Sequence, residues 1–119
     1  MTEPILARAF YETDAVTLAS SLLGKRLWAE TPAGTLAGII TETEAYCGVT
    51  DRASHAYGGR RTARTETMYL PGGYAYVYLI YGLYACLNVT AAMREDPQAV
   101  LIRAILPSDN LPLFHANWR

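Results

Sequence analysis

The chain has 119 residues, a formal net charge of −1, 51% hydrophobic residues and 18% charged residues, which excludes a disordered chain and fits one domain with one core. No apolar run reaches the roughly 20 residues of a membrane-spanning helix, and the N-terminus lacks the basic start and apolar middle of a secretory signal. We therefore expect a cytoplasmic domain with no membrane partner.

The N-terminal part of the chain predicts one helix followed by two strands. Thr13 or Asp14 can cap the helix, apolar residues recur at helical spacing over 16–23, and Gly24 suits the position after its end. Turn residues and a run of β-branched residues follow. The strands are predicted at residues 25–30 and 36–46.

The rest of the chain predicts a long loop and further strands. Residues 47–73 contain many Gly, Arg and Thr residues, so we expect mostly loop, with a short helical turn near 51–55. Two strands, Tyr74–Tyr81 and Tyr84–Thr90, are predicted to form a hairpin, and 99–106 is predicted as another strand. The expected fold class is therefore α+β: a single domain over residues 1–119 with few helices, a mixed or antiparallel sheet and a protruding β-hairpin.

Candidate catalytic groups lie on two of these strands. Glu42, Glu44 and Tyr46 share one face because side chains alternate along a strand. By themselves the residues do not distinguish Glu42 from Glu44 as a catalyst, and either could be a surface carboxylate. Arg103 interrupts an apolar strand, and a charge in that setting usually has a partner, for which Glu44 and Glu42 are the candidates.

A basic segment and a tyrosine-rich hairpin complete the pattern. The net charge argues against nucleic-acid binding, but four arginines fall within residues 52–64 with no acid among them, and local charge decides where a polyanion binds. The alternative is a solvated loop. On the hairpin, Tyr74, Tyr76 and Tyr78 share a face, which by itself is more simply a strand face packed on a core, while Tyr81 lies near the tip. An aromatic residue at a tip can wedge between stacked bases.

Six segments resemble the alkyladenine (3-methyladenine) DNA glycosylase family in order and spacing. They are Glu42–Tyr46 (ETEAY), Ala53–Ala56 (ASHA), Gly58–Arg64 (GGRRTAR), Met68–Gly82 (MYLPGGYAYVYLIYG), Cys86–Val89 (CLNV) and Val100–Ala104 (VLIRA). The resemblance covers residues from about 6 to 113. It implies a DNA repair enzyme that flips an alkylated purine out of duplex DNA and hydrolyses its glycosidic bond.

The resemblance also implies a role for each matching residue. Glu44 matches the carboxylate that activates water, and Arg103 an arginine that helps to hold that water and the lesion phosphate. Tyr81 matches the residue that intercalates into DNA. The remaining matches are base-pocket residues (Tyr46, His55, Tyr78 and Asn88) and a segment that contacts the DNA backbone (Arg60, Arg61 and Arg64). Without the resemblance, His55 is more simply a hydrogen-bonded loop histidine and Asn88 a turn cap.

The implied enzyme is monofunctional and uses neither a metal nor a cofactor. Lys25 is the only lysine and lies outside the matched site segments, so no Schiff-base nucleophile is expected. Family members are longer, which implies that this chain lacks the C-terminal third. An incomplete domain leads us to expect an exposed, self-associating sheet edge, for example at 99–106. Two alternatives to a working enzyme remain for such an incomplete domain. One is a module that binds DNA without turnover, and the other is a truncated remnant of such an enzyme.

Overall fold

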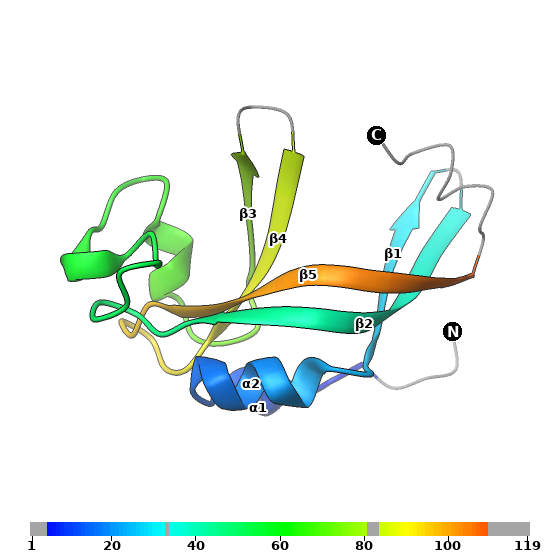
Figure 1. The fold of residues 1–119 in the computed structure, drawn as a ribbon, viewed down its shortest axis with the longest axis horizontal. Coiled ribbons are helices and arrows are strands. Elements are labelled where there is room, and N and C mark those ends of the chain that lie inside the picture. The colour runs from blue at the N-terminus through cyan, green and yellow to red at the C-terminus, as the bar shows by residue number, and fades with distance from the viewer. Residues whose placement is uncertain (1–4, 33, 81–83, 110–119) are drawn as a thin grey trace.

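The computed structural model describes residues 5–32, 34–80 and 84–109, and this part of the chain forms one antiparallel sheet with helices on one face (Figure 1). The strand order is β1-β2-β5-β4-β3. The bounds are α1 (Arg8–Tyr11), α2 (Ala15–Leu22), β1 (Arg26–Thr31), β2 (Gly34–Tyr46), β3 (Ala75–Ile80), β4 (Tyr84–Ala91) and β5 (Gln98–Asp109), with 3₁₀ turns at Tyr57–Gly59 and Glu66–Tyr69. The expected α+β class is confirmed, as is the pairing of β3 with β4.

Local sequence accounts for α2. The carboxylate of Asp14 accepts hydrogen bonds from the backbone N–H of Thr17 at 3.0 Å and from its hydroxyl at 2.7 Å, so Asp14, rather than Thr13, is the cap. Gly24 follows the helix with φ +84°, a conformation that glycine adopts without strain. The sequence did not predict α1, which has four residues and no side-chain cap.

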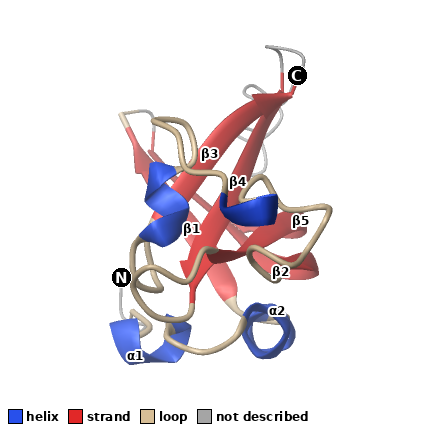
Figure 2. Ribbon diagram, turned by 90° about the vertical axis from the view of Figure 1, so that its left-hand side faces the viewer, coloured by secondary structure: helices blue, strands red, loops and turns tan. Residues whose placement is uncertain are grey.

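The sheet separates two apolar clusters. The helices α1 and α2 lie on one side of the sheet and residues 47–73 on the other (Figures 1 and 2). On one face, α2 packs against β2, β4 and β5 through Leu18, Ile40 and Val100, among others. On the other face, residues 47–73 (green in Figure 1) bring Met68 against Tyr76, together with Ala56, Tyr69 and Ala99. The loop that the sequence predicts is therefore a packed layer. Its 3₁₀ helices lie at 57–59 and 66–69, and where a helical turn is expected near 51–55 there is a hydrogen-bonded turn, in which the N–H of Ser54 donates to the carbonyl of Asp51 at 3.0 Å.

Three register shifts interrupt the long β2–β5 ladder, and two of them lie close to Glu42. Ile40 lies opposite Ile105 and Glu42 opposite Ala104, so Thr41 has no residue opposite it. Thr43 then lies opposite Ile102, which leaves Arg103 without an opposite residue on β2. Bulges of this kind redirect side chains and are common beside active sites.

The expectation of a bare edge at 99–106 holds for only part of that strand: residues 99–101 pair on both sides, whereas residues 102–106 pair with β2 alone. β5 pairs with β2 from end to end and with β4 at residues 98–101, while β1 and β3 are the outer strands of the described sheet. Beyond Leu101 the β3–β4 hairpin diverges from β2 and β5, as Figure 1 shows. Within the described residues, β5 beyond Leu101 therefore has no strand partner on its β4 side, and the outer strands β1 and β3 have none on their outer sides.

Candidate active site

Four residues form a row across the sheet on the face that residues 47–73 cover. Glu44 lies opposite Leu101, and Leu101 lies opposite Asn88. Asn88 in turn lies opposite Tyr76. Residues opposite one another in an antiparallel sheet point to the same face, so Glu44 and Asn88 share a face at two strand spacings, about 10 Å. Tyr46, two residues along β2 from Glu44, lies on this face as well.

Glu44 and Arg103 form an ion pair at the open end of this row. Arg103 Nη1 donates to Glu44 Oε2 at 2.8 Å, and the side chains are 54% and 41% exposed. The hydrogen bond from Arg103 to Glu44 raises the pKa of the guanidinium, and the carboxylate charge raises it further. An ion pair this exposed stabilises a fold little, so its main effect is to orient the carboxylate. Of the two partners that the sequence allows for Arg103, the structure selects Glu44.

A small cavity lies beside this row, beneath residues 47–73. Its volume is about 10 Å³, enough for one water molecule but not for a nucleobase. Asn88, 1% exposed, is at its floor and donates a long hydrogen bond of 3.4 Å to the carbonyl of Cys86. The lining residues are Tyr46, Ala53, His55, Met68, Tyr76 and Asn88. The structure thus brings three of the four expected base-pocket residues together.

His55 is fixed by Tyr76, a contact that the sequence analysis did not predict. The His55 Nδ1 and the Tyr76 hydroxyl are 3.0 Å apart, and the rings meet edge to face at 6.2 Å between centroids. Burial lowers the pKa of His55, and the positive charges of Arg64 and Arg60 lower it further. The alternation of Tyr74, Tyr76 and Tyr78 was the available signal, since it places Tyr76 on an inward face.

The lowered pKa of His55 predicts a specific loss of stability in mild acid. An unfolded histidine titrates near pH 6.5. Below about that pH the unfolded chain therefore binds a proton that the folded chain does not, so the free energy of unfolding falls as pH drops from about 6.5 toward the folded pKa. Urea unfolding at pH 7.5 and 5.5 should show a smaller drop for His55→Gln than for the unsubstituted chain.

A matched control separates His55 from the other titrating groups. Several carboxylates also have lowered pKa values, but they contribute equally to both chains in this comparison. The second histidine, His115, lies outside the described residues. His115→Gln should keep the full pH dependence, and the same reduction in both variants would contradict the assignment to His55.

A larger basic hollow adjoins the other side of His55. It has a volume of about 330 Å³ and is open to solvent. Arg60 and Arg64 are exposed at its rim, while Thr65 is 3% exposed. The Thr65 hydroxyl accepts a hydrogen bond from the backbone N–H of Thr62 at 2.8 Å, which holds the loop in a tight turn. The hollow is lined by His55, Arg60, Thr62, Arg64 and Thr65.

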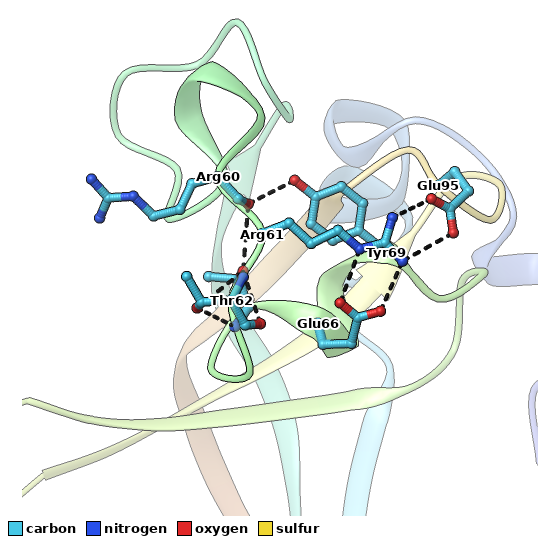
Figure 3. A network of polar contacts seen from close by, with 7 residues as sticks. Arg60, Arg61, Thr62, Glu66, Tyr69 and Glu95 are labelled. Carbon is cyan, nitrogen blue, oxygen red and sulfur yellow. Dashed lines mark hydrogen bonds and ion pairs between the residues drawn. The ribbon is translucent and has the colours of Figure 1, made fainter.

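Arg61 is placed differently from its two neighbours. Figure 3 shows its guanidinium between the carboxylates of Glu66 and Glu95. It also lies over the ring of Tyr69, with Cζ 4.4 Å from the ring centroid. Neither acid was singled out from the sequence. Glu95 is 34 residues from Arg61 along the chain, so only the fold brings these two side chains together.

Two expected site residues cannot be placed. Tyr81 lies outside the described residues. The backbone of Tyr78, in β3, pairs with that of Cys86 in β4, but the side chain of Tyr78 is not among those described. Among the described residues, no three His, Cys, Asp or Glu side chains form a group that could hold a metal ion, and no helix is long and apolar enough to cross a membrane.

A match to a known protein family covers almost the whole chain. A model of the methylpurine-DNA glycosylase (MPG) family matches residues 9–119. The chain belongs to this family. The family resemblance seen in the six sequence segments is therefore confirmed.

Individual relatives cover nearly all of this chain, but the match spans only about half of their own length. A Clostridium botulinum (strain Alaska E43 / Type E3) protein named "Putative 3-methyladenine DNA glycosylase" is 57% identical over 106 residues, which are 89% of this chain and 52% of that protein. Proteins of the same name from Clostridium acetobutylicum and Clostridium novyi are 52% and 47% identical over 92% and 94% of this chain, and the matches cover 53% and 55% of their lengths.

Proposed function

We propose that this MPG-family chain is a DNA glycosylase that excises alkylated purines of the 3-methyladenine type from duplex DNA. The observation that carries the proposal is the Glu44–Arg103 ion pair, on the same sheet face as the buried Asn88 and the Tyr46–His55 cavity. The names of the relatives support the same activity.

In the proposed reaction, Glu44 acts as the general base. Arg103 occupies Oε2, whereas Glu44 Oε1 has no hydrogen-bond partner among the described residues and faces solvent. That oxygen accepts a proton from a water molecule while the water oxygen attacks the sugar carbon C1′. The bond from C1′ to the purine nitrogen breaks, and its electron pair leaves with the base. The products are a free purine and an abasic site, and Glu44 returns its proton to solvent.

An alkylated purine suits this mechanism because alkylation leaves the base cationic. The positive charge weakens the glycosidic bond and favours stacking on the electron-rich rings of tyrosine. We assign Tyr46, His55, Tyr78 and Asn88 to the flipped base and Tyr81 to the gap it leaves in the duplex. Since the cavity holds only about one water, base binding requires its lining side chains to move apart.

The exposed arginines at the rim of the basic hollow are proposed to contact the DNA backbone. Each phosphate contact contributes about −0.9 to the slope of log affinity against log salt concentration. Arg60→Ala and Arg64→Ala should each reduce the slope by about that amount, measured by fluorescence anisotropy with duplex DNA over a salt series. Arg26→Ala, on β1, is the control with the same charge change, and an equal slope change in it would contradict a local contact.

The test of the proposed function is release of free purine from methylated duplex DNA by the purified chain. Release that exceeds the spontaneous rate supports the proposal. The small volume of the Tyr46–His55 cavity also favours a second candidate, a module that binds lesion DNA without turnover. Tight, lesion-dependent binding without release by a cooperatively folded chain would select that candidate.

A further inference from the structure

The guanidinium of Arg61 is bound by two carboxylates of this protein. Its Nε and Nη2 donate to the two oxygens of Glu66 at 2.9 and 2.8 Å, in a bidentate pair. Nη1 donates to Glu95 Oε2, and Nη2 also reaches Glu95 Oε1 at 3.2 Å. The hydrogen bonds that Arg61 donates to Glu66 and Glu95 raise the pKa of Arg61 well above its ordinary value. The cluster of Arg61, Glu66 and Glu95 therefore contains one positive and two negative charges, and its net charge is negative.

This charge balance is unfavourable for a phosphate contact. A phosphate that approached Arg61 would meet two carboxylates already bound to the same guanidinium, and like charges close together repel. The neighbouring arginines differ, because Arg60 and Arg64 are exposed around the open hollow. Among the described residues no carboxylate forms a salt bridge with either of them. The sequence does not distinguish the three arginines. In the structure Arg61 is paired with two acids, whereas Arg60 and Arg64 are exposed.

The contacts of Arg61 connect the basic loop to the turn between β4 and β5. Tyr69, beneath the guanidinium, donates its hydroxyl to the carbonyl of Arg60 at 2.7 Å (Figure 3). The carbonyl of Tyr69 accepts the backbone N–H of Glu95 at 2.7 Å. Glu95 lies between β4 and β5 with φ +73°, a strained conformation for a non-glycine residue. The network therefore joins the loop at residue 60 to the strands that carry Asn88 and Arg103.

We propose that Arg61 is a positioning residue that locks the 60–66 loop onto the β4–β5 turn through Glu66 and Glu95, so that Arg60 and Arg64 are held around the hollow beside His55. The effect of Arg61 on DNA binding rests on the proposed function. The attachment of the 60–66 loop to the β4–β5 turn, which we call the lock, is a property of the free protein. It assigns Arg61 a role other than the backbone contact that the resemblance implies.

Substituting the two acids distinguishes the two roles by the sign of the effect. The double variant E66Q/E95Q removes two negative charges beside the proposed DNA surface and releases Arg61. If Arg61 were a phosphate contact held back by these acids, duplex DNA would bind more tightly and with a steeper salt dependence. If Arg61 positions the loop, affinity should fall about threefold to fivefold despite the favourable charge change, as expected for the loss of exposed ion pairs. The control E12Q/E30Q makes the same charge change at exposed acids outside this network.

Amide hydrogen exchange tests the lock without DNA. The amides of Thr65, Met68 and Glu95 donate to carbonyls within the locked segments. They should exchange several-fold faster in E66Q/E95Q and in Arg61→Met, while amides of α2 keep their rates and show that the fold is intact. Unchanged exchange at these three amides would overturn the lock even if DNA binds as proposed. If the unsubstituted chain does not bind DNA, the proposed function fails and the exchange rates still decide the role of Arg61. Tighter or unchanged DNA binding by E66Q/E95Q would overturn the positioning role.

Discussion

Replacing Glu44 with glutamine should lower the rate of purine release from methylated duplex DNA by about 10²-fold or more, the range that a positioned general base contributes. The amide keeps the shape of the side chain but cannot accept the proton of the attacking water. Arg103 can still donate to the amide oxygen, so the local structure should persist. Release of free base from radiolabelled or mass-resolved DNA measures the effect, with duplex binding recorded in parallel.

Glu42 provides the matched control. It is the acid that the sequence could not distinguish from Glu44, it is two residues away on the same strand, and it is exposed. No hydrogen bond joins it to Arg103 in the structure, in contrast to Glu44. Glu42→Gln should therefore retain most of the activity. A full loss in Glu42→Gln with activity preserved in Glu44→Gln would reverse the assignment of the catalytic carboxylate.

Leu18→Ala should destabilise the fold by about 2–5 kcal/mol, the range for removing a fully buried leucine side chain. Leu18 is 0% exposed and lies in the cluster where α2 meets β2, β4 and β5. The loss combines the transfer free energy of the deleted methyl groups with the cavity left beneath the helix. Chemical unfolding followed by circular dichroism measures it, and the effect is large against the roughly 5–15 kcal/mol stability of a typical domain.

Val16 offers a control within the same helix. It is 60% exposed, so Val16→Ala removes little buried surface and should change the free energy of unfolding by only about 0.5 kcal/mol. Similar midpoints for Leu18→Ala and Val16→Ala would contradict the packing of α2 on the sheet. Because Leu18 lies on the opposite face from Glu44, a folded Leu18→Ala chain should retain lesion binding at low temperature.

Elements governed by neighbouring residues were predictable from the sequence. The cap at Asp14, the end of α2 before Gly24 and the β3–β4 hairpin depend on local conformational preferences, so they were placed within a few residues. The family was predictable too, because its motifs are short contiguous segments that the family model matches across residues 9–119. The 47–73 layer was less predictable. Its turns depend on packing against the sheet, which periodicity does not reveal.

By itself the sequence determined which residue types were available for the site; the tertiary structure decided which of them meet. Arg103 pairs with Glu44 across 59 residues, and that choice depends on the register of β2 with β5 and on the bulges at Thr41 and Arg103. Arg61 is bound by Glu95 because the β4–β5 turn is brought against the basic loop. Charge pairing acts through space over a few ångströms, so strand register and loop packing, not sequence spacing, determine whether an arginine orients a catalytic acid, locks a loop or faces solvent.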